Sequence, residues 1–444
     1  MRTPRDIATG LVRQLQAAGY EAFWVGGCVR DFLLGRNPED YDIATSASPP
    51  QIEALFERTI PVGRKFGVIV VVRNGHEFQI ATFRAEADYA DGRHPETVSF
   101  GDAKADASRR DFTINGLFYD PVADRLHDWV GGEADLRRKL VRTIGNPAER
   151  FAEDHLRLLR TVRFAAQLGF EIETETFSAV RALAPKIQLI SAERVRDELW
   201  KLFRPPHAAR GLQLLQDSGL LMEVLPEIAA TKGCDQTPDY HPEGDVFNHL
   251  LAMLAQLPAD AHELLPWAAL LHDVAKPVTA TRNPETGRVH FYNHERIGED
   301  MSVRILERLR FPRKQIEEIA NAVRYHMQFK DVPLMRKATL RRMLLRPTFP
   351  LELELHRLDC LGSHGQLDIY ERMIAEARSL DEKPSLKPPL LNGDDLLNLG
   401  MKPGPDIGAV LQELRDKQLQ EEIATPAEAR EWVKSRLRDS DSRE

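Results

Sequence analysis

An apolar run, a pair of glycines and an Asp-x-Asp motif follow one another between residues 23 and 45. If Asp40 and Asp42 lie in a strand, their side chains point to the same face, about 7 Å apart. Carboxylates at that spacing can hold two Mg²⁺ ions about 4 Å apart, which clamp the attacking and leaving oxygens of phosphoryl transfer. An isolated Asp-x-Asp is more often a solvated turn. Gly26 and Gly27, just upstream, favour the metal site because their backbone N–H groups can approach a triphosphate.

The chain is too long, at 444 residues, for one hydrophobic core, so we expect several domains. The net charge of −8 gives no global signal for nucleic acid, and a polyanion would have to meet a local basic patch. Cys28, Cys234 and Cys360 are far apart and indicate free thiols in a reducing compartment. No stretch resembles an export signal or could span a bilayer. We therefore expect a cytoplasmic protein that has no membrane partner, and nothing in the sequence calls for an obligatory protein partner.

The first third of the chain has the pattern of a mixed α and β domain. Residues 5 to 18 have helical spacing, and Asn74-Gly75 between two β-rich runs predicts a hairpin in an antiparallel or mixed sheet. Residues 91 to 108 are polar and lack a period, so we expect most of them to form a loop.

Four polar residues come next, beside apolar neighbours: Arg109, Arg110, Asp111 and Asn115. They must find partners on a ligand or among themselves.

The pattern becomes helical near residue 146. Residues 151 to 169 predict one helix that ends at Gly169 and carries Asp154 and Arg157 on its polar side. These charges are either solvated or present an acceptor and a fork of donors to a flat ligand edge. Cytosine and adenine both show an amino donor beside a ring-nitrogen acceptor, and uracil and guanine reverse that order. Such a pair would therefore accept C and A.

A second group of chemical residues lies in apolar helical segments between residues 240 and 330: His249, His272, Asp273, His294 and His326. A single histidine is more often a satisfied core or surface residue than a ligand. Converging from separate helices, these five would suit one or two transition-metal ions that activate water on a phosphate ester.

One later segment is basic, with Arg336, Lys337, Arg341, Arg342 and Arg346. It is either an RNA-backbone patch or a solvated helix face that balances nearby acids, and the two readings are equally good.

Taken together, these motifs resemble the class II nucleotidyltransferases that act on RNA 3′ ends, a family of CCA-adding tRNA nucleotidyltransferases and bacterial poly(A) polymerases. GGCVRD with DYD resembles the family's catalytic motif, RRDFTIN its ribose and triphosphate motif, and EDHLRLLRTVRF its base-selecting motif. DWVGGEADL and SAERVRDEL resemble the hinge and neck motifs. LLHDVAKP is similar to the HD-superfamily phosphohydrolases, and LLNGDDLLNLGMKPGP to the C-terminal region of members with such a domain.

The resemblance covers nearly the whole chain and implies an α+β fold. A polymerase-β-like nucleotidyltransferase head with a mixed or antiparallel sheet would occupy residues 1–145. All-α domains would follow: a neck with the base-selecting motif at 146–235, an HD phosphohydrolase-like domain at 236–335 and an RNA-binding tail at 336–436.

The resemblance also implies roles for individual residues. Asp40 and Asp42 would be catalytic and bind Mg²⁺, and the five residues of the HD site would bind a divalent transition metal. The partners would be tRNA, CTP and ATP. The nucleotide would contact Gly26, Gly27, Arg30, Arg84, Arg110, Asp111, Asn115, Asp154, Arg157, Arg160 and Arg163.

Two positions depart from the family pattern. Gln79 stands where members often have an acid, so only two metal-binding carboxylates are implied. Gly116 stands where alanine is usual.

The implied function is template-independent addition of C, C and A to tRNA 3′ ends, together with HD phosphohydrolase activity. Poly(A) polymerase or A-only addition is the alternative within the family, since the Asp154 and Arg157 pair does not separate them. CC-only addition fits less well, because the loop with Asp91-Gly92-Arg93 is present. From another class, the protein could be chiefly an HD phosphohydrolase whose head only binds. The intact Asp-x-Asp argues against that reading.

Overall fold

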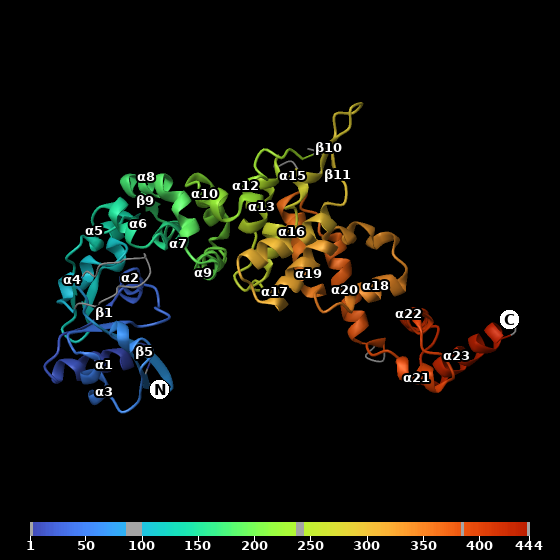
Figure 1. The fold of residues 1–444 in the computed structure, drawn as a ribbon, viewed down its shortest axis with the longest axis horizontal. Coiled ribbons are helices and arrows are strands. Elements are labelled where there is room, and N and C mark those ends of the chain that lie inside the picture. Colours follow the sequence, from blue (N-terminus) through green and yellow to red (C-terminus); the bar gives the residue numbers. More distant parts are fainter. Residues whose placement is uncertain (1–2, 86–99, 237–243, 383–385, 442–444) are drawn as a thin grey trace. The chain divides into compact units, whose positions relative to one another are not determined.

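The computed structural model describes residues 3–85, 100–236, 244–382 and 386–441. The chain forms two compact units, Met1–Pro226 and Glu227–Glu444 (Figure 1). Among the described residues, no helix has the length and apolar character needed to cross a bilayer. The Asp91-Gly92-Arg93 sequence of the expected loop lies outside the described residues.

The first unit begins with a seven-stranded sheet. Its strands are β1 (Ala22–Val25), β2 (Ile43–Thr45), β3 (Thr59–Ile60), β4 (Val68–Arg73), β5 (His76–Thr82), β6 (Phe118–Asp120) and β7 (Arg125–His127). The strand order is β3-β4-β5-β2-β1-β6-β7; β2 and β5 are parallel, and all other neighbours are antiparallel. Asn74 and Gly75 form the β4–β5 turn with φ of 53° and 81°, values that suit a two-residue hairpin. The expected α+β class and mixed sheet are confirmed.

Alternate side chains of the sheet enter two cores. Trp24 and Ile80 pack into the larger core with residues of α1 (Pro4–Ala17), α2 (Gly27–Leu33) and α3 (Pro49–Leu55). Phe23, Phe83 and Phe118 pack into a smaller core with Ala103 and Ala107 of α4 (Ala103–Ser108). Because neighbours along a strand face opposite ways, Phe23 and Trp24 serve different layers.

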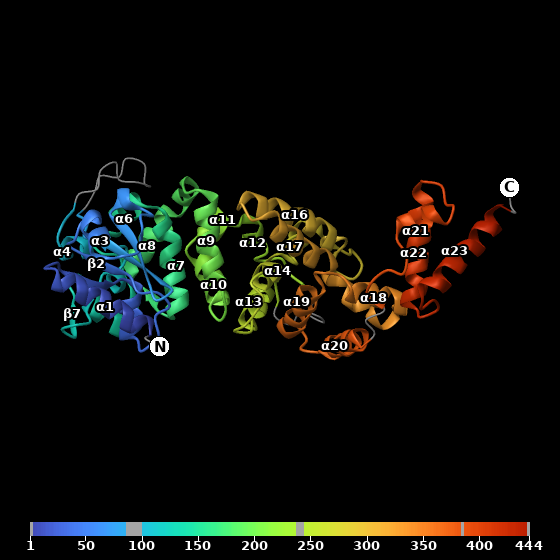
Figure 2. The ribbon, with the colours of Figure 1, turned by 90° about the horizontal axis from the view of Figure 1, so that it is seen from below.

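Helices follow the sheet. Short elements link the sheet to the neck: η1 (Arg64–Phe66), η2 (Thr113–Asn115), α5 (Gly132–Arg138), β8 (Leu140–Val141) and β9 (Glu171–Ile172). The helices that follow, in the region expected to form the neck, are α6 (Pro147–Glu153), α7 (Leu156–Leu168), α8 (Thr174–Leu183), η3 (Ala184–Leu189), α9 (Ala192–Leu202), α10 (Ala208–Asp217) and α11 (Leu220–Val224), and α12 (Pro226–Ala229) spans the boundary between the two units. α7 packs against α9 and α10, as Figure 2 shows.

The single helix expected over residues 151–169 is wrong at its start. Asp154 has extended backbone angles, φ −149° and ψ 104°, and separates α6 from α7. Its Oδ1 accepts a hydrogen bond from the backbone N of Leu156 at 3.0 Å, so the aspartate supports the new helix start instead of continuing the old one. Gly169 ends α7 in the left-handed conformation, as expected.

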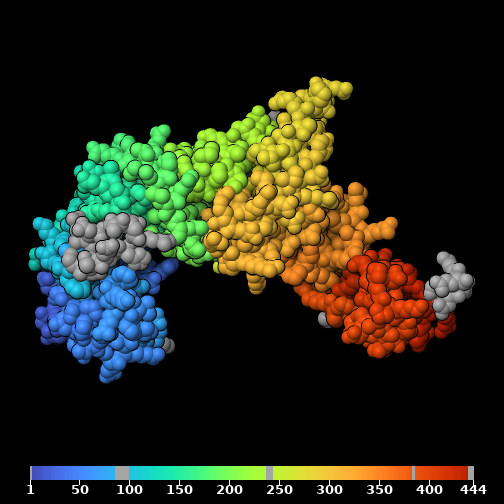
Figure 3. Space-filling view, in the orientation of Figure 1, coloured from blue at the N-terminus to red at the C-terminus, as the bar shows by residue number. Residues whose placement is uncertain are grey.

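The second unit is almost entirely helical. Its first elements are α13 (Val246–Ala255), α14 (Leu265–Leu271), α15 (Lys276–Thr279), β10 (Ala280–Arg282), β11 (Val289–Phe291), α16 (His294–Arg308), α17 (Arg313–Tyr325) and η4 (His326–Leu334). They are followed by α18 (Lys337–Leu344), α19 (Phe349–Gly362), α20 (Asp368–Asp381), α21 (Gly393–Asn398), α22 (Pro405–Leu419) and α23 (Pro426–Asp441). Figure 3 shows the β10–β11 hairpin projecting from the surface of this unit.

The basic residues of α18 have partners inside the protein. Arg341 is buried and donates to the backbone O of Leu419 at 2.7 Å. Other ion pairs join Lys337 to Glu421, Arg342 to Asp416 and Arg346 to the fully buried Glu352. The contacts of Lys337, Arg341 and Arg342 dock α18 on α22 and the residues just after it, and Arg346, which follows α18, pairs with Glu352 of α19. They favour the structural reading of the basic segment over an RNA-backbone patch.

Candidate functional sites

The Asp-x-Asp motif lies at the edge of the glycine turn. Asp40 and Asp42 are exposed on either side of the buried Tyr41, immediately before β2. The expectation that the motif lies in a strand is therefore wrong, because the motif ends immediately before β2, although the alternation of buried and exposed side chains is present. The backbone N of Val25 donates to the O of Asp42 at 3.0 Å and ties the motif to the end of β1.

Asp42 has a perturbed acidity. Although the Asp42 side chain is exposed, it faces the cavity, and the loss of bulk water around its carboxyl group raises its pKa. The charge of Arg110 opposes this rise, and the nearby Asp40 adds to it. A carboxylate whose ionisation is disfavoured by burial and by a neighbouring acid is a group that a divalent cation would stabilise. On the neighbouring strand, Gln79 precedes Ile80, which pairs with Ile43 in parallel register, so the amide occupies the place beside Asp42.

A cavity of about 430 Å³ opens next to Asp42. Six arginines and three aspartates contribute to its wall, an excess of three positive charges that suits a polyanion. Its volume is within the range of small-molecule sites. The lining residues are Gly26, Gly27, Arg30, Asp42, Arg109, Arg110, Asp111, Asn115, Asp154, Leu156, Arg157, Arg160, Phe164 and Arg194.

The turn at Gly26 requires glycine for two reasons. Its φ of +76° lies in the left-handed region, which strains other residues. A Cβ there would also stand 3.0 Å from Nη1 of Arg110. The missing side chain thus lets a guanidinium lie directly over the turn.

A hydrogen-bonded chain crosses the floor of the cavity. Nη1 of Arg30 donates to Oδ1 of Asn115 at 2.8 Å, and Nδ2 of Asn115 donates to Asp111 at 3.1 Å. The other oxygen of Asp111 accepts from Nε of Arg160 at 2.9 Å. Burial alone would raise the pKa of Asp111, but the charge and hydrogen bonds of Arg160 outweigh it and lower the pKa. Asp111 is therefore an ionised acceptor that organises its neighbours.

Asp154 and Arg157, the pair expected to select the base, both face the cavity, but they do not bind each other. Nη1 of Arg157 donates to Glu153 at 2.6 Å and to the backbone O of Arg150 at 3.0 Å. Oδ2 of Asp154 accepts from Nη2 of Arg194 on α9 at 2.7 Å. A carboxylate oxygen has a second lone pair, so this contact leaves Asp154 able to accept from a nucleobase.

Two of the expected nucleotide contacts lie outside the cavity wall. Arg163 is buried, donates to Glu198 at 2.5 Å and stacks on Phe164. Arg160, one turn earlier on the same side of α7, pairs with Asp111 in the cavity wall and has its Nη1 3.9 Å from Glu198, whereas Arg163 is directed to Glu198 of α9. Arg84 stands at the end of β5, where its backbone N donates to Asp106.

Four lining residues were not assigned a site role from the sequence. Arg109, Leu156, Phe164 and Arg194 complete the wall. The ring of Phe164 lies within 5.3 Å of the guanidinium carbons of Arg30, Arg160 and Arg163. Phe164 lies in an apolar helical run of the sequence, so its contact with three guanidinium groups could not be predicted from the sequence. Arg194 belonged to a quoted motif, but only the fold places it beside Asp154.

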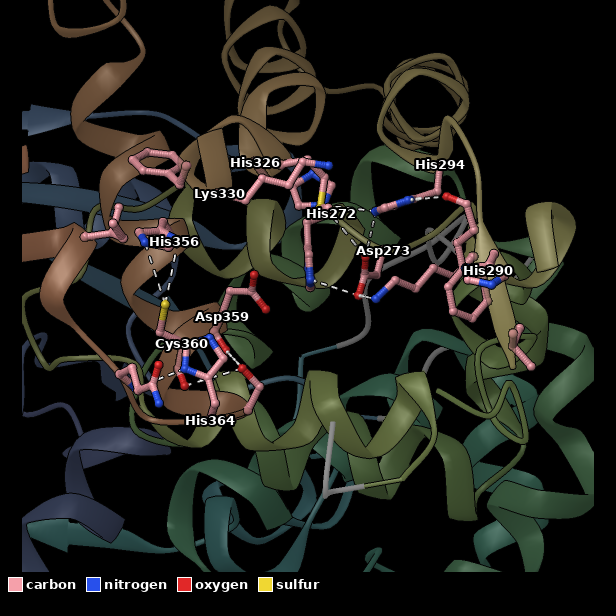
Figure 4. A pocket seen from close by; sticks show the side chains of 18 of the residues that line it. His272, Asp273, His290, His294, His326, Lys330, His356, Asp359, Cys360 and His364 are labelled. Carbon is pink, nitrogen blue, oxygen red and sulfur yellow. Dashed lines mark hydrogen bonds and ion pairs between the residues drawn. The ribbon is translucent and has the colours of Figure 1, made fainter. Parts of the chain in front are cut away.

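The second unit contains a histidine-rich cavity of about 810 Å³. Figure 4 shows His272, His294 and His326 gathered around Asp273. Distances from Nε2 to the Asp273 carboxylate are 3.1 Å for His272, 3.5 Å for His294 and 3.8 Å for His326. His249, fully buried, is the other member of the two groups that could each hold an ion: His249, His272 and Asp273, and Asp273, His294 and His326.

Backbone carbonyls fix the orientation of three of these rings. Nδ1 of His272 lies 2.8 Å from the backbone O of Ala269, and Nδ1 of His294 lies 2.8 Å from the backbone O of Phe291. Nδ1 of His326 lies 2.6 Å from the backbone O of Val323. A neutral ring that donates from Nδ1 presents the Nε2 lone pair to the cluster. Burial lowers the pKa of His294 and lowers that of His326 to about 3, so these rings are neutral at pH 7. Nε2 of His294 and Nε2 of His326, 3.2 Å apart, are then facing acceptors that a cation would satisfy.

Asp359 on α19 was missed. Its Oδ1 lies 3.1 Å from Nε2 of His249, and it lines the same cavity. Burial would raise the pKa of Asp359, but the hydrogen bond and charge of His249 lower it strongly. Its surroundings, RLDCLG, read as an ordinary amphipathic helix, so the sequence gave no reason to choose it.

Comparison with known proteins matches three parts of the chain. Residues 22–142 match the "Poly A polymerase head domain", residues 169–232 the "Probable RNA and SrmB- binding site of polymerase A", and residues 246–361 the "HD domain".

Similar whole proteins also exist. An A-adding tRNA nucleotidyltransferase of Deinococcus radiodurans is 35% identical over 428 residues, covering 92% of this chain and 94% of the relative. A CCA-adding enzyme of Geobacillus thermodenitrificans is 46% identical over 221 residues, so the match spans 50% of this chain and 54% of the relative. The crystal structure of a Bacillus stearothermophilus CCA-adding enzyme in complex with CTP is 29% identical, with a TM-score of 0.76 and full coverage of both chains.

Proposed function

Since this chain belongs to the class II family of CCA-adding and A-adding tRNA nucleotidyltransferases, we propose that it adds C, C and A in turn to the 3′ end of tRNA, using CTP and ATP. The observation that carries this proposal is the arginine-lined cavity in which Asp42, the Gly26 turn and Asp154 meet. Phosphate-binding groups lie at one part of its wall, and an acceptor for a base amino group lies at another. The CTP complex of the similar crystal structure supports the choice of nucleotide.

Asp40 and Asp42 would hold the Mg²⁺ ions, which lower the pKa of the RNA 3′-hydroxyl and neutralise the charge on the triphosphate. The residues of this chain bind and orient the substrates. Arg30 and Arg110 flank the glycine turn where the phosphates would lie, and Asp154 would accept a hydrogen bond from the amino group of cytosine or adenine. Because uracil and guanine place an acceptor at that position, they would face the carboxylate unfavourably.

The second candidate is addition of A alone, because the relative aligned over nearly the whole length is an A-adding enzyme. Poly(A) addition is the third. Three tRNA transcripts, ending at the discriminator base, after one C and after CC, separate these activities when each is given one nucleotide at a time. The proposal requires C on the first two and A on the third. Growth of a long A tail, or extension of only the CC-ended transcript, would show a different activity.

We also propose that the histidine-rich cavity is a metal-dependent phosphoesterase site. Its support is the set of Nε2 atoms and carboxylates of His249, His272, Asp273, His294, His326 and Asp359, which can hold two divalent ions with Asp273 between them. Lys276, Arg288 and Lys330 line the same cavity and would attract a phosphate. The ions would generate hydroxide from bound water near neutral pH.

Hydrolysis of p-nitrophenyl phosphate and bis(p-nitrophenyl) phosphate, with Mn²⁺, Co²⁺ or Ni²⁺ added to chelator-treated protein, tests this second proposal. Activity should require the added metal and disappear in His294→Ala. Metal-independent hydrolysis, or none with any of the three metals, would refute it. Were hydrolysis present and nucleotide transfer absent, the alternative of a phosphohydrolase with a binding head would replace the leading proposal.

A further inference from the structure

Asp106 is a buried acid behind the nucleotide cavity. It lies on α4, its side chain is 1% exposed, and it is not part of the cavity wall. A charge so deeply buried is costly unless it is paired. Its partners are two arginines that do line the cavity.

Both oxygens of Asp106 are occupied. Oδ1 accepts from Nε of Arg109 at 2.9 Å and from the backbone N of Arg84 at 3.1 Å. Oδ2 accepts from Nε of Arg110 at 3.2 Å and from Nη2 of Arg110 at 2.9 Å. Burial would raise the pKa of Asp106, but the charges of Arg110 and Arg109 outweigh it and lower the pKa, so the group is an anion.

The fork of Arg110 leaves one nitrogen for the cavity. Nε and Nη2 are held by Asp106, and Nη1 lies over the Gly26 turn. Phe118 supports the guanidinium from one side, with its ring centroid 5.0 Å away. Arg110 and Asp42 line the same cavity, where the charge of the arginine opposes the rise in the pKa of that carboxyl. The arginine therefore lies between two acids, one buried behind it and one at the metal site.

These contacts suggest a competition. If Asp106 did not hold Arg110, the guanidinium could turn toward Asp42, an exposed acid in the wall of the same cavity. An Arg110–Asp42 ion pair would occupy the carboxylate that Mg²⁺ needs, and it would remove Nη1 from the glycine turn.

We propose that Asp106 is a positioning residue for nucleotide transfer: it holds Arg110 over the Gly26 turn, where the triphosphate is bound, and keeps it from pairing with Asp42. Through Oδ1 it also fixes Arg109, whose backbone O lies 3.5 Å from Nη2 of Arg157, a residue of the base-selecting motif. This inference rests on the proposed transfer reaction and names a residue that touches neither nucleotide nor metal.

The test is Asp106→Asn in the full-length protein, with CTP addition measured against CTP and against Mg²⁺. Asparagine has nearly the same size but loses the charge, and its NH₂ group cannot accept from an arginine. We expect KM for CTP to rise about tenfold, consistent with loss of a charge-assisted hydrogen bond. The Mg²⁺ concentration for half-maximal rate should rise several-fold, because the released Arg110 competes for Asp42.

Asp102→Ala is the matched control. Asp102 is exposed, caps the same helix through the backbone N of Ala105 at 2.8 Å, and does not line the cavity. This variant weakens α4 without touching the arginines. An equal rise in the Mg²⁺ requirement in both variants would reduce Asp106 to a helix-stabilising residue.

A double variant separates positioning from general damage. In Asp106→Asn with Arg110→Gln, no guanidinium is left to compete for Asp42, so the Mg²⁺ requirement should return toward the wild-type value while KM for CTP stays raised. A Mg²⁺ requirement that remains as high as in Asp106→Asn would overturn the proposal, as would an unchanged KM and Mg²⁺ requirement in the single variant. If the wild type itself transferred no nucleotide, the proposed function would fail instead, and the two failures are distinguishable.

Discussion

Among single residues, Gly26 and Gly116 lie where the packing of the head leaves little room for a side chain. Gly26→Ala adds a Cβ at φ +76° and 3.0 Å from Nη1 of Arg110. We expect a stability loss of about 1–2 kcal/mol from the backbone strain. Displacement of the arginine should also raise KM for CTP about tenfold. Steady-state kinetics and thermal unfolding measure the two effects.

Gly75→Ala is the control for Gly26→Ala. Gly75 has a similar φ of +81°, and nothing lies within 4 Å of an added Cβ. It should therefore show the strain without the change in KM. If both variants raised KM equally, the contact with Arg110 would have no part in nucleotide binding.

The crowding around Gly116 explains why glycine stands where the family usually has alanine. A Cβ there would lie 2.7 Å from Cγ2 of Val130 and 3.0 Å from Cδ1 of Ile144, so these larger neighbours occupy the space that alanine would need. Gly116→Ala should destabilise the head by about 1–3 kcal/mol through overpacking. Val130→Ala in the same chain should recover part of that loss in denaturant titrations. A neutral Gly116→Ala would contradict the crowding.

At the scale of elements, the contact between α9 and the start of α7 bears on base selection. Arg194→Gln removes the donor that holds Asp154 and should relax the preference for C and A over U and G, with a smaller effect on the CTP rate. Misincorporation with UTP and GTP at saturating concentration measures it. Arg196→Gln is the control on the same helix, because Arg196 pairs with the exposed Asp197. If the nucleotide selectivity of Arg194→Gln were unchanged, the hydrogen bond from Arg194 to Asp154 would not be needed for base selection.

The pH dependence of the second unit follows from its buried histidines. Burial, then the charge of His272, lowers the pKa of His326 to about 3. Below pH ~6.5 the unfolded chain binds a proton there that the folded chain does not, so stability is lost as pH falls from about 6.5 toward 3. One such group contributes about 2 kcal/mol of loss between pH 7 and pH 5.

Hydrogen exchange of α17 peptides in chelator-treated protein, corrected for intrinsic rates, should show reduced protection at pH 5. His326→Asn should show less of this pH dependence. The lowered pKa values of Asp273 and Asp359 act only below about pH 4, where their unfolded forms are protonated. Equal pH dependence in wild type and variant would contradict the assignment to His326.

The sequence predicted elements whose signal is local. The Asn74-Gly75 hairpin and the helix stop at Gly169 need only φ preferences, and both are present. The break at Asp154 was not predicted, because an aspartate fits equally well in a helix or at its cap, and only the contact with Arg194 and the bond to Leu156 decide between these. Likewise Arg160 and Arg163 look equivalent in sequence, and only the fold gives Arg160 a bond to Asp111 in the cavity wall.

At the scale of the whole molecule, motifs identified the family because they are long and contiguous. Asp359 was not predicted because its contact with His249 depends on α19 meeting α13, a contact between distant segments. The basic segment at α18 was similarly undecided until α22 supplied its acids. Most residues that line the two sites could be chosen from the sequence. The partner of each charged side chain could not, because it depends on how distant segments pack together.

The two proposed sites lie in different compact units and should act independently. Asp42→Ala should abolish nucleotide transfer and retain metal-dependent phosphoesterase activity, and His272→Ala should do the reverse. Both activities measured on each purified variant check this. Loss of both in either variant would show that the sites depend on each other.

The most direct test of the central claim is product sequencing after reaction of wild type and Asp42→Ala with a tRNA transcript that ends at the discriminator base, given CTP and ATP together. Wild type should add C, C and A and then stop, and the variant should add nothing. A tail of A residues, a product that stops after CC, or full extension by Asp42→Ala would contradict it.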